Sequence, residues 1–115
     1  MTDAISIANA EHYGWGDGCD GWHLLQDPRL SVIHERVPVG KGEVSHYHSV
    51  AQQFFFIISG RASVELDGRL IHLTPGEGLH VAPGRTHKFR NAGDTAVEFL
   101  VISSPTSRGD RKDVV

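Results

Sequence analysis

Apolar and polar residues alternate in short runs along most of this chain, which is the spacing expected of β-strands. No stretch keeps a helical spacing of apolar residues for more than about two turns. Instead, runs rich in β-branched and aromatic residues recur between turn-forming residues. We therefore predict an all-β protein, with strands at 22–26, 30–37, 43–47, 53–59, 62–66, 69–73, 78–82, 87–90 and 96–103.

The residues between these runs have the chemistry of tight turns. Asp67 and Gly68 separate two alternating runs by two residues, which is typical of a type I′ hairpin because both positions need a positive φ. Pro75-Gly76 marks a further turn by similar chemistry. Many short strands at this spacing are typical of a barrel or sandwich. We expect one small domain over residues 1–115, with a polar tail at 105–115 that is partly mobile.

Composition and charge narrow the class of protein. The 115 residues include 11 Lys and Arg against 14 Asp and Glu, for a net charge of −3, so the chain lacks the concentrated basic face that nucleic acid requires. The longest apolar run, 54–58, is far shorter than the roughly 20 residues of a membrane helix. The single cysteine, Cys19, and the lack of a secretory leader in residues 1–10 favour a cytoplasmic location. A small molecule is the expected partner.

The eight histidines suggest a metal site. His46 and His48 are two residues apart on one predicted strand, so both imidazoles point to the same side, roughly 6.5 to 7 Å apart along the backbone. Gln53 follows after four residues, and His87 lies on a later predicted strand. We leave the remaining histidines out of the site and expect them to be exposed: His12, His23, His34, His72 and His80.

The residues around these histidines resemble the two motifs of the cupin superfamily. The first is Gly-(x5)-His-x-His-(x3 or 4)-Glu-(x6)-Gly, and the second is Gly-(x5)-Pro-x-Gly-(x2)-His-(x3)-Asn. The match runs from Gly40 to Asn91, with Pro83 one place later than the proline of the second motif. The resemblance implies an RmlC-like double-stranded β-helix, a jelly-roll barrel. It also implies one divalent transition metal ion, Zn, Ni, Fe, Mn or Cu, because imidazole suits all of them. The implied ligands are His46, His48, Gln53 and His87.

Gln53 stands where the family has glutamate. Its amide oxygen is a neutral ligand, so the ion keeps its full charge and is a stronger Lewis acid, while a carboxylate that would support an oxidised metal is missing. Redox chemistry is therefore disfavoured. By strand parity, Phe55 and Ile57 share the inward side with Gln53, and Phe89 shares it with His87, so we expect these three to contact a ligand.

Three functions are compatible with these residues. The ligand set resembles that of a small cupin that linearises unsaturated uronates, although Val101 stands where that likeness places an acid. The leading hypothesis is a Lewis-acid enzyme that performs an isomerisation, ring-opening or lyase step on a small oxygenated substrate such as a sugar acid. Arg108 would pair with a substrate carboxylate. The alternatives are a dioxygenase with Fe or Ni, and a non-catalytic ligand-binding or sensing protein, which the absence of any evident inward carboxylate favours.

The outward side of the 53–59 run predicts an association between copies. Phe54, Phe56 and Ile58 point away from the barrel interior, and residues 96–102 are apolar on both faces apart from Glu98. A solvated outer face would carry polar residues, so we expect a homodimer, with the N-terminal segment as an alternative cover. Separately, 16–21 reads GxGxxG, but no strand precedes it and no helix follows it, so it is not interpreted as a dinucleotide site.

Overall fold

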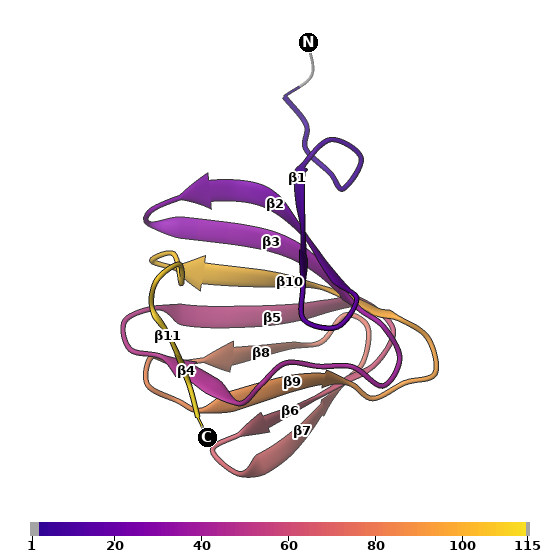
Figure 1. Ribbon diagram of the computed structural model, residues 1–115, viewed down its shortest axis with the longest axis vertical. Helices are drawn as coiled ribbons and strands as arrows, with labels where there is room; N and C mark the ends of the chain where they lie inside the picture. Colours follow the sequence, from indigo (N-terminus) through magenta and orange to yellow (C-terminus); the bar gives the residue numbers. More distant parts are fainter. Residues whose placement is uncertain (1–2, 115) are drawn as a thin grey trace.

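Two antiparallel β-sheets face each other around a single core in the computed structural model, which describes residues 3–114 (Figure 1). One sheet has the order β1 (Glu11–Trp15), β2 (Cys19–Asp27), β3 (Leu30–Val37), β10 (Val97–Ser104), β5 (Gln52–Ser59) and β8 (Gly78–Val81). The other has the order β11 (Arg111–Asp113), β4 (His46–His48), β9 (His87–Asn91), β6 (Ala62–Leu66) and β7 (Arg69–Leu73). The predicted all-β jelly-roll barrel, the double-stranded β-helix, is confirmed.

The core lies between the sheets because every second residue of their central strands points inward. Burial alternates strictly along β10 and nearly so along β5. The rings of Phe89 and Phe99 stack with centroids 4.0 Å apart, and Phe55 packs against both. Each such side chain contributes about 1.5–3 kcal/mol by burial. This apolar layer lies next to the histidines, and the ring of Phe55 is 5.8 Å from that of His87.

Glycines explain where the observed strands differ from the predicted ones. The N-terminal half of the first hairpin, β1 and the start of β2, was not predicted because glycines interrupt the alternation; Gly16 and Gly18 form its turn with φ values of 55° and 76°. The strand predicted at 43–47 forms only over β4, because Gly42 packs against the backbone of β9, where a Cβ would lie 2.6 Å from the Phe89 carbonyl oxygen. The predicted hairpin at Asp67 and Gly68 has positive φ at both residues, 49° and 84°.

The C-terminal segment crosses the open end of the barrel and adds β11 to the edge of β4. The Asp110 carboxylate accepts hydrogen bonds from the backbone N–H groups of residues 49, 50 and 51, at 2.9–3.0 Å. The partial mobility of the tail stays a prediction. Residues 3–114 include no helix long and apolar enough to cross a membrane.

Candidate metal site

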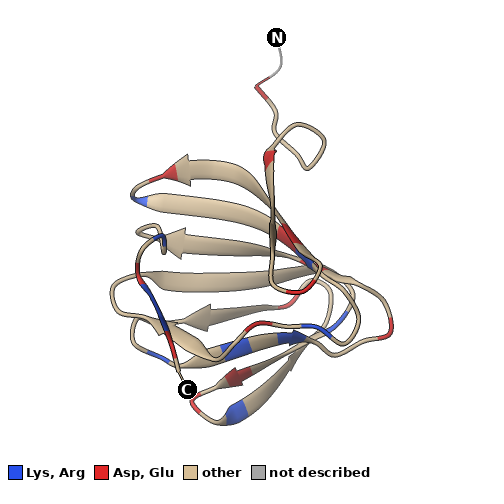
Figure 2. Cartoon of the chain, in the orientation of Figure 1, with Lys and Arg blue, Asp and Glu red and all other residues tan. Residues whose placement is uncertain are grey.

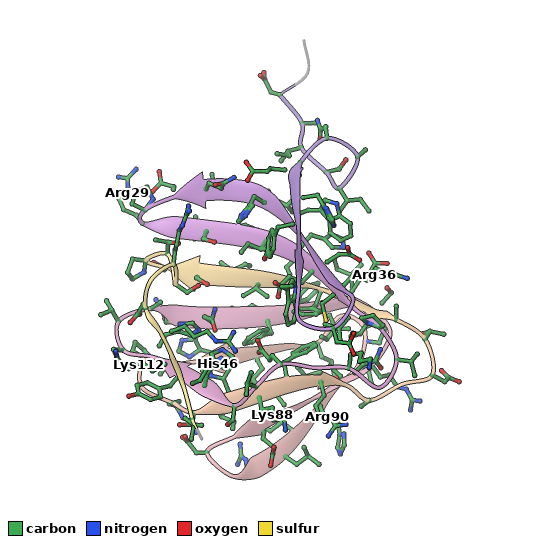
Figure 3. All side chains as sticks on the ribbon, viewed as in Figure 1. Arg29, Arg36, His46, Lys88, Arg90 and Lys112 are labelled. Carbon is green, nitrogen blue, oxygen red and sulfur yellow. The ribbon has the colours of Figure 1, made fainter. Side chains whose placement is uncertain are left out.

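Three histidines on two neighbouring strands converge at one end of the barrel interior. His46 and His48 lie on β4, and His87 is the direct cross-strand partner of His46 on β9. All three are buried, and their ligand nitrogens lie within 4.8 Å of one another. Two ligand atoms at about 2.1 Å from a common ion can be at most about 4.2 Å apart, so small ring movements would complete a site. Figure 3 places the labelled His46 between the two sheets.

Each imidazole is oriented by its Nδ1 atom. Each Nδ1 lies within hydrogen-bond distance of a backbone carbonyl oxygen: His46 with Val44 at 2.8 Å, His48 with Asp110 at 3.1 Å, and His87 with Arg85 at 3.0 Å. A carbonyl oxygen can only accept, so Nδ1 carries the hydrogen and donates it. In a neutral ring Nε2 then holds a lone pair, which is the form that binds a metal.

The protonation of these rings also suits a metal. Burial lowers the pKa of His46 to about 4, and burial likewise lowers the pKa of His48 and of His87. The three side chains are therefore neutral at physiological pH.

Gln53 completes the donor set from the opposite sheet. Its Nε2 donates to the Ser103 hydroxyl at 3.1 Å, which aims its Oε1 at Nε2 of His87, 3.2 Å away. Both facing atoms are acceptors when His87 is neutral, so neither can donate to the other. Two ligands at right angles on one ion would be about 3 Å apart, given bonds of about 2.1 Å. The residues present therefore fit a divalent ion.

Two acidic side chains that the sequence analysis missed also face this space. Glu35 on β3 and Glu43 in the β3–β4 connection line the same cavity as His46, His48 and Gln53. The expectation that no carboxylate points inward beside the histidines was wrong. Glu35 could have been found, because it shares its parity with Ile33 and Val37 on the predicted strand. Glu43 could not, because the predicted strand at 43–47 puts it on the side opposite to His46, whereas the structure has it in the connection before β4.

The position of Glu35 depends on Tyr13 and Gly21. These three residues are cross-strand neighbours on β1, β2 and β3, and the Tyr13 hydroxyl donates to Oε2 of Glu35 at 2.9 Å. A Cβ at position 21 would overlap the Tyr13 ring. Gly21, the third glycine of the GxGxxG pattern, therefore leaves space for the Tyr13 ring. The ring crosses β2 there and reaches Glu35 on β3.

Burial dominates the electrostatics of both acids. It raises the pKa of Glu35 to about 7, against the opposing effects of the Tyr13 hydrogen bond and the Arg111 charge. It raises the pKa of Glu43 to about 8, with the nearby Glu35 carboxylate adding to the rise. The Tyr13 hydroxyl has a raised pKa as well, from burial and from Glu35. The site thus holds two carboxyl groups whose raised pKa values bring their loss and uptake of protons close to neutral pH.

Two adjoining cavities give access to these groups. The inner one, about 290 Å³, is lined by His46, His48 and Gln53, and the outer one, about 580 Å³, lies over β1–β3. Tyr13, Ile33, Ser107 and Arg108 line both. Phe55 also lines the inner cavity. Ile57 and Phe89 lie deeper in the apolar core and line neither of these two cavities. Ligand contact by Arg108 and these three stays a prediction.

The other histidines lie outside the cluster. His72 and His80 are exposed on β7 and β8, and His12 is exposed on β1. His34 is half-buried beside Glu98, 2.8 Å away. His23 lines the outer cavity, where its ring lies 4.8 Å from that of Tyr13.

Comparisons with known proteins agree with this architecture. The Cupin domain family matches residues 33–103. Quercetin 2,3-dioxygenase of Bacillus subtilis is 33% identical over 64 residues, which are 56% of this chain and 19% of that protein. The chain spans about two thirds or less of the length of the first curated relatives it matches.

Solved structures show the same fold at low identity. KdgF from Halomonas sp. has a TM-score of 0.82 at 18% identity, covering 92% of this chain and 96% of that one. The polyketide cyclase RemF from Streptomyces resistomycificus has a TM-score of 0.84 at 17% identity, covering 100% and 87%. Since the family match spans more than half of the chain and includes all four candidate ligands, the protein belongs to the cupin family.

Proposed function

We propose that this protein is a metal-dependent enzyme that performs an isomerisation, ring-opening or lyase step on a small oxygenated molecule such as a sugar acid. One observation carries the proposal: the cavity that His46, His48 and Gln53 line is also lined by the side chains of Glu35 and Glu43. His87 joins the two histidines and the Gln53 amide oxygen from beneath this cavity. A bound divalent ion would act as a Lewis acid that polarises a carbonyl or hydroxyl oxygen.

Glu35 is the proton-transfer group in this proposal. Its carboxyl faces the cavity of the histidines, and its pKa of about 7 suits both removal and return of a proton near neutral pH. Tyr13 holds one carboxyl oxygen at 2.9 Å, which leaves the other for the substrate. Reactions that move a proton beside a polarised carbonyl need these two functions together.

Arg108 would bind an acidic group of the substrate. It lines the boundary between the inner and outer cavities, so a carboxylate paired with it would leave the rest of a small molecule free to reach the histidines. Glu11 and Asp27 line the outer cavity, where their negative charge would repel a second acidic group of the substrate. They favour a substrate whose other groups are uncharged hydroxyls.

A dioxygenase with Fe or Ni is the second candidate. The similarity to quercetin 2,3-dioxygenase over 64 residues favours it. Gln53 by itself argues against it, because a neutral ligand at that position supports an oxidised ion less well than the carboxylate of the motif does.

The test is a turnover screen on protein purified without an affinity tag and loaded separately with Zn²⁺, Ni²⁺, Fe²⁺, Mn²⁺ or Cu²⁺. Sugar acids and phenolics that shift the unfolding temperature are followed by NMR with an oxygen electrode in parallel, and His48→Ala is the metal-site control. Conversion without oxygen uptake supports the Lewis-acid enzyme, whereas conversion with oxygen uptake supports the dioxygenase. Binding without conversion for every metal would overturn both and identify a ligand-binding protein.

A further inference from the structure

The carboxyl group of Glu43 lies beside His46, one of the candidate metal ligands. Oε2 of Glu43 lies 3.9 Å from Nε2 of His46. The His46 ring donates from Nδ1 to the Val44 carbonyl oxygen, so its Nε2 presents a lone pair toward the carboxylate. An ionised Glu43 would repel this lone pair, so the two atoms need either the carboxyl proton or a metal cation between them.

The separation of these two atoms is that of ligands on one ion. Atoms bound at about 2.1 Å to a common ion cannot be more than about 4.2 Å apart, and 3.9 Å is within that limit. Glu43 lies outside the group of three histidines that are mutually within 4.8 Å, so reaching the ion requires a side-chain rotation. A cavity of about 290 Å³ beside it leaves room for that movement.

The surroundings leave the charge of Glu43 only partly compensated. Its side chain is 12% exposed, and it accepts a hydrogen bond from the backbone of Phe89. The nearest cation is the Arg111 guanidinium at 3.6 Å, beyond a short hydrogen bond. Arg111 itself makes its close contact with Asp113, at 2.8 Å. Burial with so little compensation favours the protonated form of Glu43, and a divalent ion would displace that proton and bind the carboxylate.

We propose that Glu43 is a ligand of the ion held by the three histidines. The carboxylate that the motif lacks at Gln53 then comes from the loop before β4, on the other side of the imidazoles. The ion would carry a formal charge one unit lower than a three-histidine, one-glutamine site. This inference rests on the metal binding proposed above, but not on turnover.

Paired glutamine variants test the assignment. Zn²⁺ and Co²⁺ affinities of the full chain are measured by chelator competition for wild type, Glu43→Gln and Glu35→Gln. Glu35 is the matched control, because it is the other acid of the same cavity and its Oε2 is bonded to Tyr13. We expect Glu43→Gln to lower the affinity at least about tenfold and Glu35→Gln to change it less than about threefold. Thermal unfolding without metal establishes that both variants fold.

A structure of the zinc-loaded protein provides the second readout. A Glu43 carboxylate oxygen about 2.0–2.2 Å from the ion confirms the assignment. Unchanged affinity in Glu43→Gln, an equal loss in Glu35→Gln, or a Glu43 carboxylate out of bonding distance would overturn it. These results are independent of the turnover screen, so an inactive protein with a Glu43 ligand would refute the proposed function alone.

Discussion

Gln53 is the residue at which this site departs from the motif of its family, and its geometry shows how a neutral amide can serve there. The Ser103 hydroxyl accepts from the amide nitrogen, which leaves the amide oxygen directed at His87. A glutamate would keep this arrangement, because the Ser103 hydroxyl can donate to a carboxylate instead. The position can therefore change its charge without changing its packing.

Gln53→Glu tests the role of that charge. We expect the variant to bind divalent metal more tightly, by about tenfold, because a full negative charge replaces a dipole beside the ion. Its turnover should be slower, since the ion polarises the substrate less. Chelator competition measures the affinity, with Gln52→Glu as the control, because Gln52 points outward and is exposed. Weaker binding by Gln53→Glu would show that position 53 is not a ligand.

Glu35 should make the stability of the metal-free protein depend on pH. Its pKa rises from 4.5 to about 7 on folding, so the folded state holds more protons than the unfolded state between these values. The free energy of unfolding should therefore fall as pH rises through this window, by up to about 3 kcal/mol from this group. The charged and titratable groups that interact with it are Tyr13, Cys19, Glu43 and Arg111.

Urea unfolding of metal-free protein between about pH 5 and pH 8 measures this dependence. Glu35→Gln should flatten the profile and raise the stability at the alkaline end, while Glu43 leaves part of the slope in place. Glu65→Gln, at an exposed position on β6, is the control. The same slope in wild type and Glu35→Gln would contradict the prediction.

At the scale of elements, β11 is part of the metal site although it supplies none of the four candidate motif ligands. It pairs with β4 along its length, and the residue before it, Asp110, has two roles. The Asp110 backbone carbonyl oxygen orients His48, and its carboxylate accepts three N–H groups of the loop that follows β4. Those bonds hold the pKa of Asp110 below its usual range.

Asp110→Ala should loosen the loop at 49–51 and with it His48. We expect the variant to unfold at a lower temperature, because three backbone donors lose a charged acceptor. Metal affinity should fall as well, by about 10-fold, because the orientation of His48 is no longer fixed. Thermal unfolding and chelator competition measure the two effects, with Asp94→Ala in an exposed turn as control. A stable variant with wild-type metal affinity would refute the role of β11.

At the scale of the whole molecule, the outer face of the six-stranded sheet has the character of an interface. Phe54, Phe56 and Ile58 are 39%, 36% and 44% exposed, and Phe54 and Phe56 pair across the strand with Ile102 and Leu100. β5 carries no charged residue and is tan throughout in Figure 2. The N-terminal strand β1 extends this sheet at its far edge and does not cover these side chains.

We expect a homodimer formed by this face. Light scattering should give about twice the chain mass of 12.6 kDa at micromolar concentration. Phe56→Glu should give a monomer with the fold intact, because the side chain points away from the core. Leu70→Glu is the matched control, since Leu70 is 55% exposed on β7 of the other sheet. A wild-type mass of 12.6 kDa would remove the dimer from consideration.

The local pattern was enough to predict most strands, the β-hairpin at residues 67 and 68, and the side on which each strand residue points. His46 and His48 could be placed together because strand parity is a property of the backbone itself. The resemblance to the cupin motifs then added Gln53 and His87, and the fold brings both to the same place as His46. The first hairpin was missed because its glycines carry no side-chain pattern to detect.

Only the tertiary structure could show which inward side chains meet. Strand parity predicts the face on which Glu35 lies. It does not show that Gly21 of β2 lies between Glu35 and Tyr13, so that the Tyr13 side chain can reach Glu35. Glu43 approaches His46 because the loop that carries it is hydrogen-bonded to β9. The pKa values of Glu35 and Glu43 are raised because the surrounding barrel removes both carboxyl groups from water. Contacts between distant segments and the dielectric of the interior arise from packing, so the charge of this site is a property of the fold and not of the motif.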